Sequence, residues 1–120
     1  MSEKKDEKYA ANLELYEKLV ATKPEVERKG ATMPYTSHNG HMFSLLGKDG
    51  NLGLRLPKDE REGFLDKYQT KLFEQYGSVM KEYVEVTDAL LRKTEELQEY
   101  FEISYAYVSS LKPKQTKKKK

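Results

Sequence analysis

The feature that most constrains this chain is a pair of apolar segments joined by a tight turn. Residues His41–Leu46 are strand-like, and Leu52–Leu56 alternates, with leucines on one face and Gly53 and Arg55 on the other. Between them lies Lys48-Asp49-Gly50-Asn51, and an Asp-Gly pair between two such segments is a strong hairpin signal. The sequence therefore predicts an antiparallel hairpin over these residues.

The other expected elements follow from apolar spacing and from the positions of proline and glycine. Helical spacing predicts a helix from Asp6 to Thr22, and the β-branched segment Val79 to Val86 predicts a strand whose charges favour an edge position. A strand over residues 26–33 and a loop over 34–40 are also expected. A helix is expected to start at Lys58, with a buried stripe of Phe64, Leu65, Tyr68 and Leu72, and a turn capped by Thr87 is expected to end at Leu91. The last helix is expected to have Thr94 as its N-cap and an apolar face of Leu97, Phe101, Ser104 or Tyr105, Val108 and Leu111.

These elements predict an α+β fold in the order α-β-β-β-α-β-α. Consecutive strands on short turns favour an antiparallel sheet of about four strands, in which a three-stranded β-meander is joined by a fourth strand. N-terminal, middle and C-terminal helices are expected to pack on this sheet. The length of 120 residues fits one domain, expected over residues 1–112.

The charge is divided unevenly along the chain. The formal net charge is +2, but six lysines lie within the last nine residues, so residues 1–111 carry 16 basic and 20 acidic side chains. The body is therefore mildly acidic and lacks the basic face of a groove-reading nucleic-acid module. Residues 113–120 are expected to form a disordered lysine-rich tail, able at most to give weak, salt-dependent contact with nucleic acid.

The composition also favours a cytoplasmic protein. The chain has no cysteine, and Met1–Lys8 is mostly charged with no apolar signal segment after it. The longest uncharged run, residues 31–47, contains Pro34, two histidines and two glycines, so no membrane helix is expected there.

Three stretches match a family pattern. They are Gly40–Leu46, Asp49–Leu56, and Met80–Val86 with the following Thr87–Leu91. They resemble, in turn, the "GxMFAL" strand, the "LYLK"-like strand and the "YWEVP" strand with its following helices in the TfoX/Sxy N-terminal domain family. The resemblance covers residues 25–111 and implies an α+β fold in a bacterial regulatory protein.

The chain also departs from that family pattern. Met33-Pro34-Tyr35-Thr36 stands where the family usually has Met-Phe-Gly-Gly, and a second domain is not expected. The family name comes from bacterial regulators of DNA-uptake competence, which carry such a second domain. YjbR-like and YdhG-like small domains are neighbouring alternatives.

The segment from Pro34 to Gly40 is the candidate ligand-binding loop. It is rich in hydroxyl and amide groups, and a ligand there would be held by Tyr35 and His38 together with Arg55. The alternative is a purely structural connection in which Asn39-Gly40 supplies the backbone angles of a turn. No metal site or cofactor is expected, because His38 and His41 have no acidic residue near them in the sequence to complete a ligand set.

Three tyrosines in the last helix are candidate interface residues. Tyr100, Tyr105 and Tyr107 span more than one helix face, so some of them are expected outside the core. Tyrosine suits protein interfaces, with a partner protein or a second copy of this chain. The alternative is that each ring lies at the margin of the sheet with its hydroxyl in water.

The functional expectation is a non-enzymatic binding or regulatory module acting through protein contacts. The chain has no nucleophile elbow and no cysteine, and its Gly47, Gly50 and Gly53 lie in a hairpin rather than between a strand and a helix. No catalytic residue is therefore assigned. The alternatives are a small-molecule-binding domain that uses Pro34–Gly40, or a weak nucleic-acid binder that depends on its tail.

The tail alternative gives a direct prediction. Deleting residues 113–120 should abolish any retention of the chain on immobilised DNA at low salt, because the remaining body is acidic. Retention is measured as a function of salt concentration for the two chain lengths. Equal retention by both would contradict this assignment to the tail.

Overall fold

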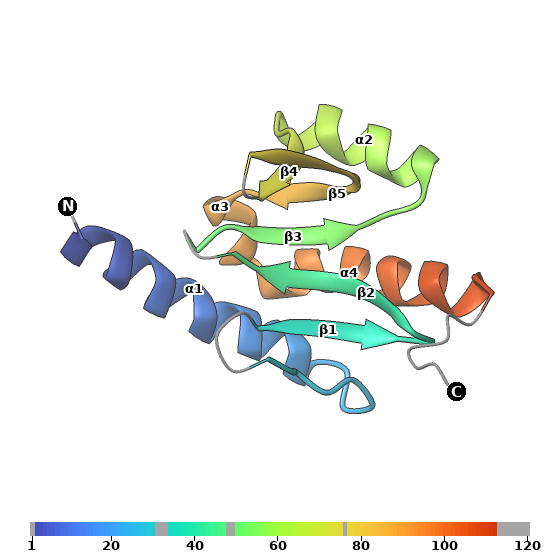
Figure 1. Cartoon of the computed structure of the whole chain (residues 1–120), viewed down its shortest axis with the longest axis horizontal. Coiled ribbons are helices and arrows are strands. Elements are labelled where there is room, and N and C mark those ends of the chain that lie inside the picture. Colours follow the sequence, from blue (N-terminus) through green and yellow to red (C-terminus); the bar gives the residue numbers. More distant parts are fainter. Residues whose placement is uncertain (1, 31–33, 48–49, 76, 113–120) are drawn as a thin grey trace.

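The computed structural model describes residues 2–30, 34–47, 50–75 and 77–112. It is an α+β fold built on one antiparallel sheet of five strands in the order β1-β2-β3-β5-β4 (Figure 1). The strands are β1 Tyr35–His38, β2 His41–Leu46, β3 Leu52–Arg55, β4 Leu72–Gln75 and β5 Ser78–Val86, and the helices are α1 Ser2–Ala21, α2 Lys58–Tyr68, α3 Asp88–Leu91 and α4 Thr94–Ser110. The expected α+β class and element order are confirmed, with one additional strand and one additional short helix.

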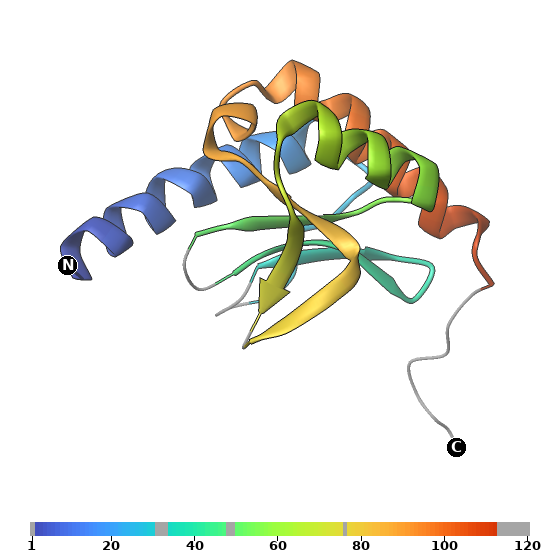
Figure 2. The same ribbon diagram turned by 90° about the horizontal axis from the view of Figure 1, so that it is seen from above.

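The helices lie on one side of the sheet, and the β4–β5 hairpin projects from the other side (Figure 2). We call these sides the inner face and the outer face. The main core fills the inner face, where apolar side chains from the strands meet those from α1, α3 and α4. The fully enclosed members of this core include Tyr16, Leu19, Phe43, Leu46, Leu52, Leu54, Leu56, Val84, Leu97, Phe101 and Val108.

The first hairpin differs from the expectation. The predicted loop 34–40 is strand β1 followed by a two-residue turn, and of the predicted strand 26–33 the described part contributes only a bridge from Lys29 to Tyr35. Residues 31–33 lie outside the described residues. Asn39 and Gly40 have φ values of 61° and 82°, which suit a tight hairpin turn and allow the flanking residues to pair directly.

Hydroxyl groups hold β1 against the core. Thr36 and Ser44 face each other across the hairpin with their hydroxyl oxygens 2.5 Å apart, and the Tyr16 hydroxyl from α1 lies 2.6 Å from that of Ser44. All three side chains are buried, and burial raises the pKa of Tyr16 far above its ordinary value. The hydroxyl-rich sequence resembled a loop because it gave no sign that these groups satisfy one another inside the protein.

The second hairpin confirms the opening prediction. Leu46 pairs with Leu52, and Gly50, with φ 86°, donates its amide hydrogen to the Gly47 carbonyl oxygen at 2.9 Å. Asp49 lies outside the described residues. Asn12 of α1 donates to the Gly50 carbonyl at 2.7 Å, so the turn is fastened to the first helix.

The region after α2 contains a strand that was not expected. The helix ends at Tyr68, because Gln69 adopts a left-handed conformation with φ 51°, and Leu72 belongs to β4 rather than to the helix stripe. The edge position predicted for Val79–Val86 is therefore wrong, since β5 lies between β3 and β4 and the edge is β4. Local sequence signals do not reveal that the short strand β4 pairs with the outer edge of β5.

The last two helices follow the expected order with one change in their caps. Thr87 caps α3 by accepting the Leu90 amide hydrogen at 3.2 Å, as predicted. The N-cap of α4 is Lys93 rather than Thr94, and Thr94 is the first helical residue. On the buried face, Ser104 is enclosed and donates to the Phe43 carbonyl oxygen at 3.2 Å, whereas Tyr105 is half-buried.

The helices were also compared with the requirements for crossing a bilayer. Over residues 2–30, 34–47, 50–75 and 77–112, no helix has both the length and the apolar character that a membrane span needs.

The outer face carries a second, smaller packing site at Gly53. A β-carbon built at Gly53 would lie 2.9 Å from Leu45 Cδ2 and 2.9 Å from Phe73 Cγ. Phe73 comes from β4, two strands away from β3 in the sheet, and it is buried together with Leu45. Because Gly53 has no side chain, β4 can place the Phe73 ring against β3 on the outer face.

Replacing Gly53 by alanine should destabilise the protein by about 1–3 kcal/mol, the usual cost of overpacking a well-filled site. The matched control is Gly63→Ala in α2, where a β-carbon meets nothing within 4 Å and removing glycine should add about 0.5–1 kcal/mol. Urea unfolding of both variants measures the difference. Equal stability of Gly53→Ala and the parent would contradict the close packing of Phe73.

Candidate functional site

The three predicted ligand-binding residues do not converge. Tyr35 lies opposite Leu45 and shares the outer face with it, whereas the His38 ring stacks on Tyr105 of α4 with a centroid distance of 4.3 Å. Arg55 lies at the end of β3, two strands away from β1. Of the three, Arg55 borders a groove described below.

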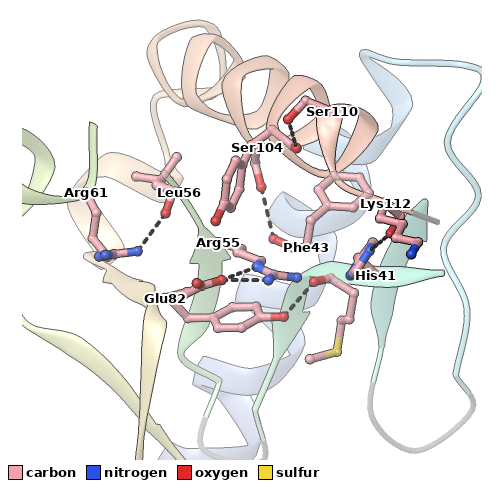
Figure 3. A network of polar contacts seen from close by, with 12 residues as sticks. His41, Phe43, Arg55, Leu56, Arg61, Glu82, Ser104, Ser110 and Lys112 are labelled. Carbon is pink, nitrogen blue, oxygen red and sulfur yellow. Dashed lines mark hydrogen bonds and ion pairs between the residues drawn. The ribbon is translucent and has the colours of Figure 1, made fainter. Parts of the chain in front are cut away.

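The two histidines and the turn between them fasten the first hairpin to the end of α4. The Asn39 amide donates to the carbonyl oxygens of Val108, at 3.1 Å, and Leu111, at 2.8 Å. His41 Nε2 lies 2.9 Å from the Lys112 carbonyl oxygen and donates to it (Figure 3). Within the described residues, no group of three or more His, Cys, Asp or Glu side chains is arranged to hold a metal ion.

The three predicted interface tyrosines are half-buried, and each has a partner within the chain. Tyr100 meets Phe64 of α2 edge-on at 4.9 Å between ring centroids. The Lys23 ammonium lies 4.2 Å from the Tyr105 ring centroid, and the Arg55 guanidinium lies 5.5 Å from that of Tyr107. These contacts favour the margin-of-sheet alternative, and the interface role stays a prediction.

A groove of about 450 Å³ runs along the first half of β5. It is lined by Arg55 and by the five consecutive residues Val79, Met80, Lys81, Glu82 and Tyr83, and we call it the β5 groove. It exists because β3 and β5 differ in length. β3 ends at Arg55 opposite Tyr83, and the last contact beyond it is the Leu56 amide donating to the Glu82 carbonyl at 3.0 Å.

The beginning of β5 therefore has an open edge. Ser78 and Val79 pair with β4 on one side, but among the described residues no strand pairs with Ser78–Lys81 on the β3 side. After Leu56 the chain turns at Pro57 into α2, and proline cannot donate a ladder hydrogen bond. A strand edge that ends in this way offers backbone groups to another chain.

An ion pair forms one end of the groove. Glu82 Oε1 accepts from Arg55 Nε at 2.7 Å and lies 2.6 Å from Arg55 Nη2, and Figure 3 shows the guanidinium pointing at the carboxylate. The Arg55 side chain is 17% exposed and that of Glu82 is 42% exposed. The pair is thus half in water, and its planar geometry fixes the position of Arg55 more than it stabilises the fold.

Tyr83, which lines the groove, links β5 to the neighbouring part of the sheet. Its hydroxyl donates to the Met42 carbonyl oxygen at 2.5 Å, which joins β5 to β2 across the shorter β3. Burial raises the pKa of Tyr83 above its ordinary value, Arg55 lowers it and Glu82 raises it. The phenol is therefore held neutral and acts as a hydrogen-bond donor.

The outer wall of the groove is apolar and basic. Val79 is 49% exposed, the largest exposure of a big hydrophobic side chain in the described part of the chain, and Lys81 beside it is exposed. Sequence reasoning missed this site because it placed β5 at the sheet edge. The available signal was length, since the predicted strand Val79–Val86 has eight residues and the predicted strand Leu52–Leu56 has five.

A second hollow, of about 660 Å³, is larger but chemically mixed. It lies where α1 meets the start of α4 and is lined by Lys18, Thr22, Arg92, Lys93, Thr94, Glu95 and Glu96. Three cations and two carboxylates share it, and the Tyr68 hydroxyl donates to Glu96 nearby. The buried Thr94 hydroxyl oxygen makes no hydrogen bond with any described residue. The β5 groove is the better candidate, because a strand edge opens onto it.

Comparison with known proteins adds no family to this description. No protein-family model matches the chain, no curated protein matches it, and no solved structure matches it.

Tyr83 gives a prediction about alkaline pH. Because its pKa is raised in the folded state, its contribution to stability is complete below about pH 10 and is lost as the pH rises through that raised value. The free energy of unfolding of Tyr83→Phe should therefore fall less between about pH 9 and 11 than that of the parent. This range covers about one unit on either side of the ordinary tyrosine pKa, and urea unfolding measures the free energy. The unfolding free energy of the variant should still fall with pH, because the pKa of Tyr16 is also raised in the folded state. Identical slopes would contradict the buried, neutral phenol.

Proposed function

We propose that this chain is a non-enzymatic binding module that acts through protein contacts, and that the β5 groove is its docking place. The observation that carries the proposal is the open edge of β5 at Ser78–Lys81, next to the exposed Val79. An unpaired strand edge with an apolar side chain beside it is the usual starting point for recognition by β-strand addition.

The polar groups of the groove support binding rather than catalysis. Arg55 is held by Glu82, and Tyr83 donates to a backbone carbonyl, so these side chains are committed to positioning one another. The small-molecule alternative loses support, because Tyr35 and His38 lie on opposite faces of the sheet and do not form a shared site with Arg55.

The proposal extends to a regulatory role of the kind that the resemblance to the TfoX/Sxy N-terminal family implies. A regulatory module needs a rigid scaffold with one accessible surface for its partner. The buried inner face supplies the scaffold, and the β4–β5 hairpin, which projects from the side of the sheet opposite the helices (Figure 2), presents the surface. A partner protein or a second copy of this chain would meet that requirement.

Site-specific photocrosslinking tests the docking place. A benzoyl-phenylalanine at Val79 should crosslink to a discrete protein in the native host, because that side chain borders the groove. The matched control is the same residue at Lys18, which is exposed on α1 and lines the other hollow rather than the groove. Crosslinked bands of equal pattern and intensity from both positions, or none from Val79, would overturn the proposal.

A further inference from the structure

We infer that the β5 groove receives an extended acidic peptide segment, which adds as a strand along Ser78–Lys81 in line with the end of β3. This inference rests on the proposed function and names the chemistry of its partner. It draws on the backbone geometry of β5, on the charges around the groove, and on the alternation of side chains along the strand.

The backbone geometry fixes the size of the added segment. β3 stops opposite Tyr83, so the four residues Ser78–Lys81 are open on that side. At about 3.3 Å per residue this edge is about 13 Å long and accommodates a segment of four or five residues. The incoming strand occupies the position that β3 would have filled had the chain not turned at Pro57.

The charges around the groove favour an acidic segment. Arg55 and Lys81 line it, and Arg61 of α2 lies beside it, because its Nη1 donates to the Leu56 carbonyl at 2.9 Å (Figure 3). Glu82 is the one carboxylate in the lining, and it and Arg55 neutralise each other, so Lys81 and Arg61 carry the net positive charge. The groove is therefore a basic island on a body that is acidic as a whole, and opposite charge both steers and orients a partner.

The side chains along β5 favour alternation in the partner. Val79 and Lys81 lie on the more exposed side of the strand and Met80 and Glu82 on the less exposed side. A strand placed beside them presents successive side chains to these two sides in turn. Apolar residues on the side of Met80 and acidic residues on the side of Lys81 satisfy both sides.

A second copy of the chain fits this edge less well. Antiparallel pairing of two β5 edges about Met80 would set each Lys81 opposite Val79 of the other copy and the two Lys81 side chains diagonally, at about 7–8 Å. Like charges at this spacing disfavour the pairing. The structure thus favours a foreign acidic strand over self-association.

A designed peptide tests the inference on the full chain. The probe is a blocked hexapeptide of alternating valine and glutamate, and its matched control has lysine in place of glutamate. In a titration followed by amide NMR, the glutamate peptide should shift the Ser78 and Met80 amide signals most strongly, because these amides point to the open edge, and bind about tenfold more tightly than the lysine peptide, a difference of about 1.4 kcal/mol. Equal or tighter binding of the lysine peptide overturns the inference.

Two further comparisons separate strand addition from simple charge attraction. Lys81→Glu should weaken binding of the glutamate peptide about tenfold, whereas Lys18→Glu on the distant α1 should change it less than about twofold. N-methylation of alternate residues removes the hydrogen-bond donors from one edge of the peptide. Of the two peptides methylated on odd or on even positions, only one should lose binding, because a strand pairs through one edge. Loss in both, or in neither, overturns strand addition.

The same measurements keep the two proposals apart. If no peptide binds while Val79 still crosslinks to a host protein, the partner is not an acidic strand and the inference fails, but the docking place stands. If the chain instead forms dimers whose contact maps to β5, the second copy is the occupant and the inference also fails.

Discussion

The contact between Phe73 and the bare backbone of Gly53 is the constraint on which the outer face depends. Because Gly53 has no side chain, the Phe73 ring approaches to within van der Waals distance of β3 and covers Leu45. That contact draws β4 over the sheet, and β4 carries the start of β5 away from the plane of the other strands (Figure 2). The open edge of β5 itself follows from the end of β3 at Arg55, so the outer face depends on the Gly53 contact and on that strand end together.

Helix α4 organises the opposite side of the same region. The Asn39 side chain donates to two carbonyl groups at the end of this helix, those of Val108, which also accepts the Leu111 amide hydrogen, and of Leu111. The first hairpin is thereby held against the helix, with His38 stacked on Tyr105. The end of the candidate ligand-binding loop Pro34–Gly40 thus joins the sheet to the helix.

The chemistry of the groove differs in kind from that of the site expected from the sequence. Tyr35, His38 and Arg55 would have offered an aromatic ring, an imidazole and a cation to a small molecule. In the folded protein they lie at three separate places, and Arg55 is joined by residues of β5 that were not among the predicted site residues. A groove along a strand edge recognises backbone geometry first and side-chain charge second, so it suits a peptide better than a metabolite.

The sequence by itself determined the elements whose signals are local. The turns at Asn39-Gly40 and Gly50, the helix stop before Pro24, the Thr87 cap and the leucine alternation of β3 all depend on neighbours a few residues away. Tertiary structure decided the rest. Whether Thr36 is a loop residue or a buried strand residue depends on Ser44 and Tyr16, and the length of open edge on β5 depends on where β3 stops. Such long-range pairings cannot be read from propensity, because their free energy belongs to both partners and appears only when the chain brings them together.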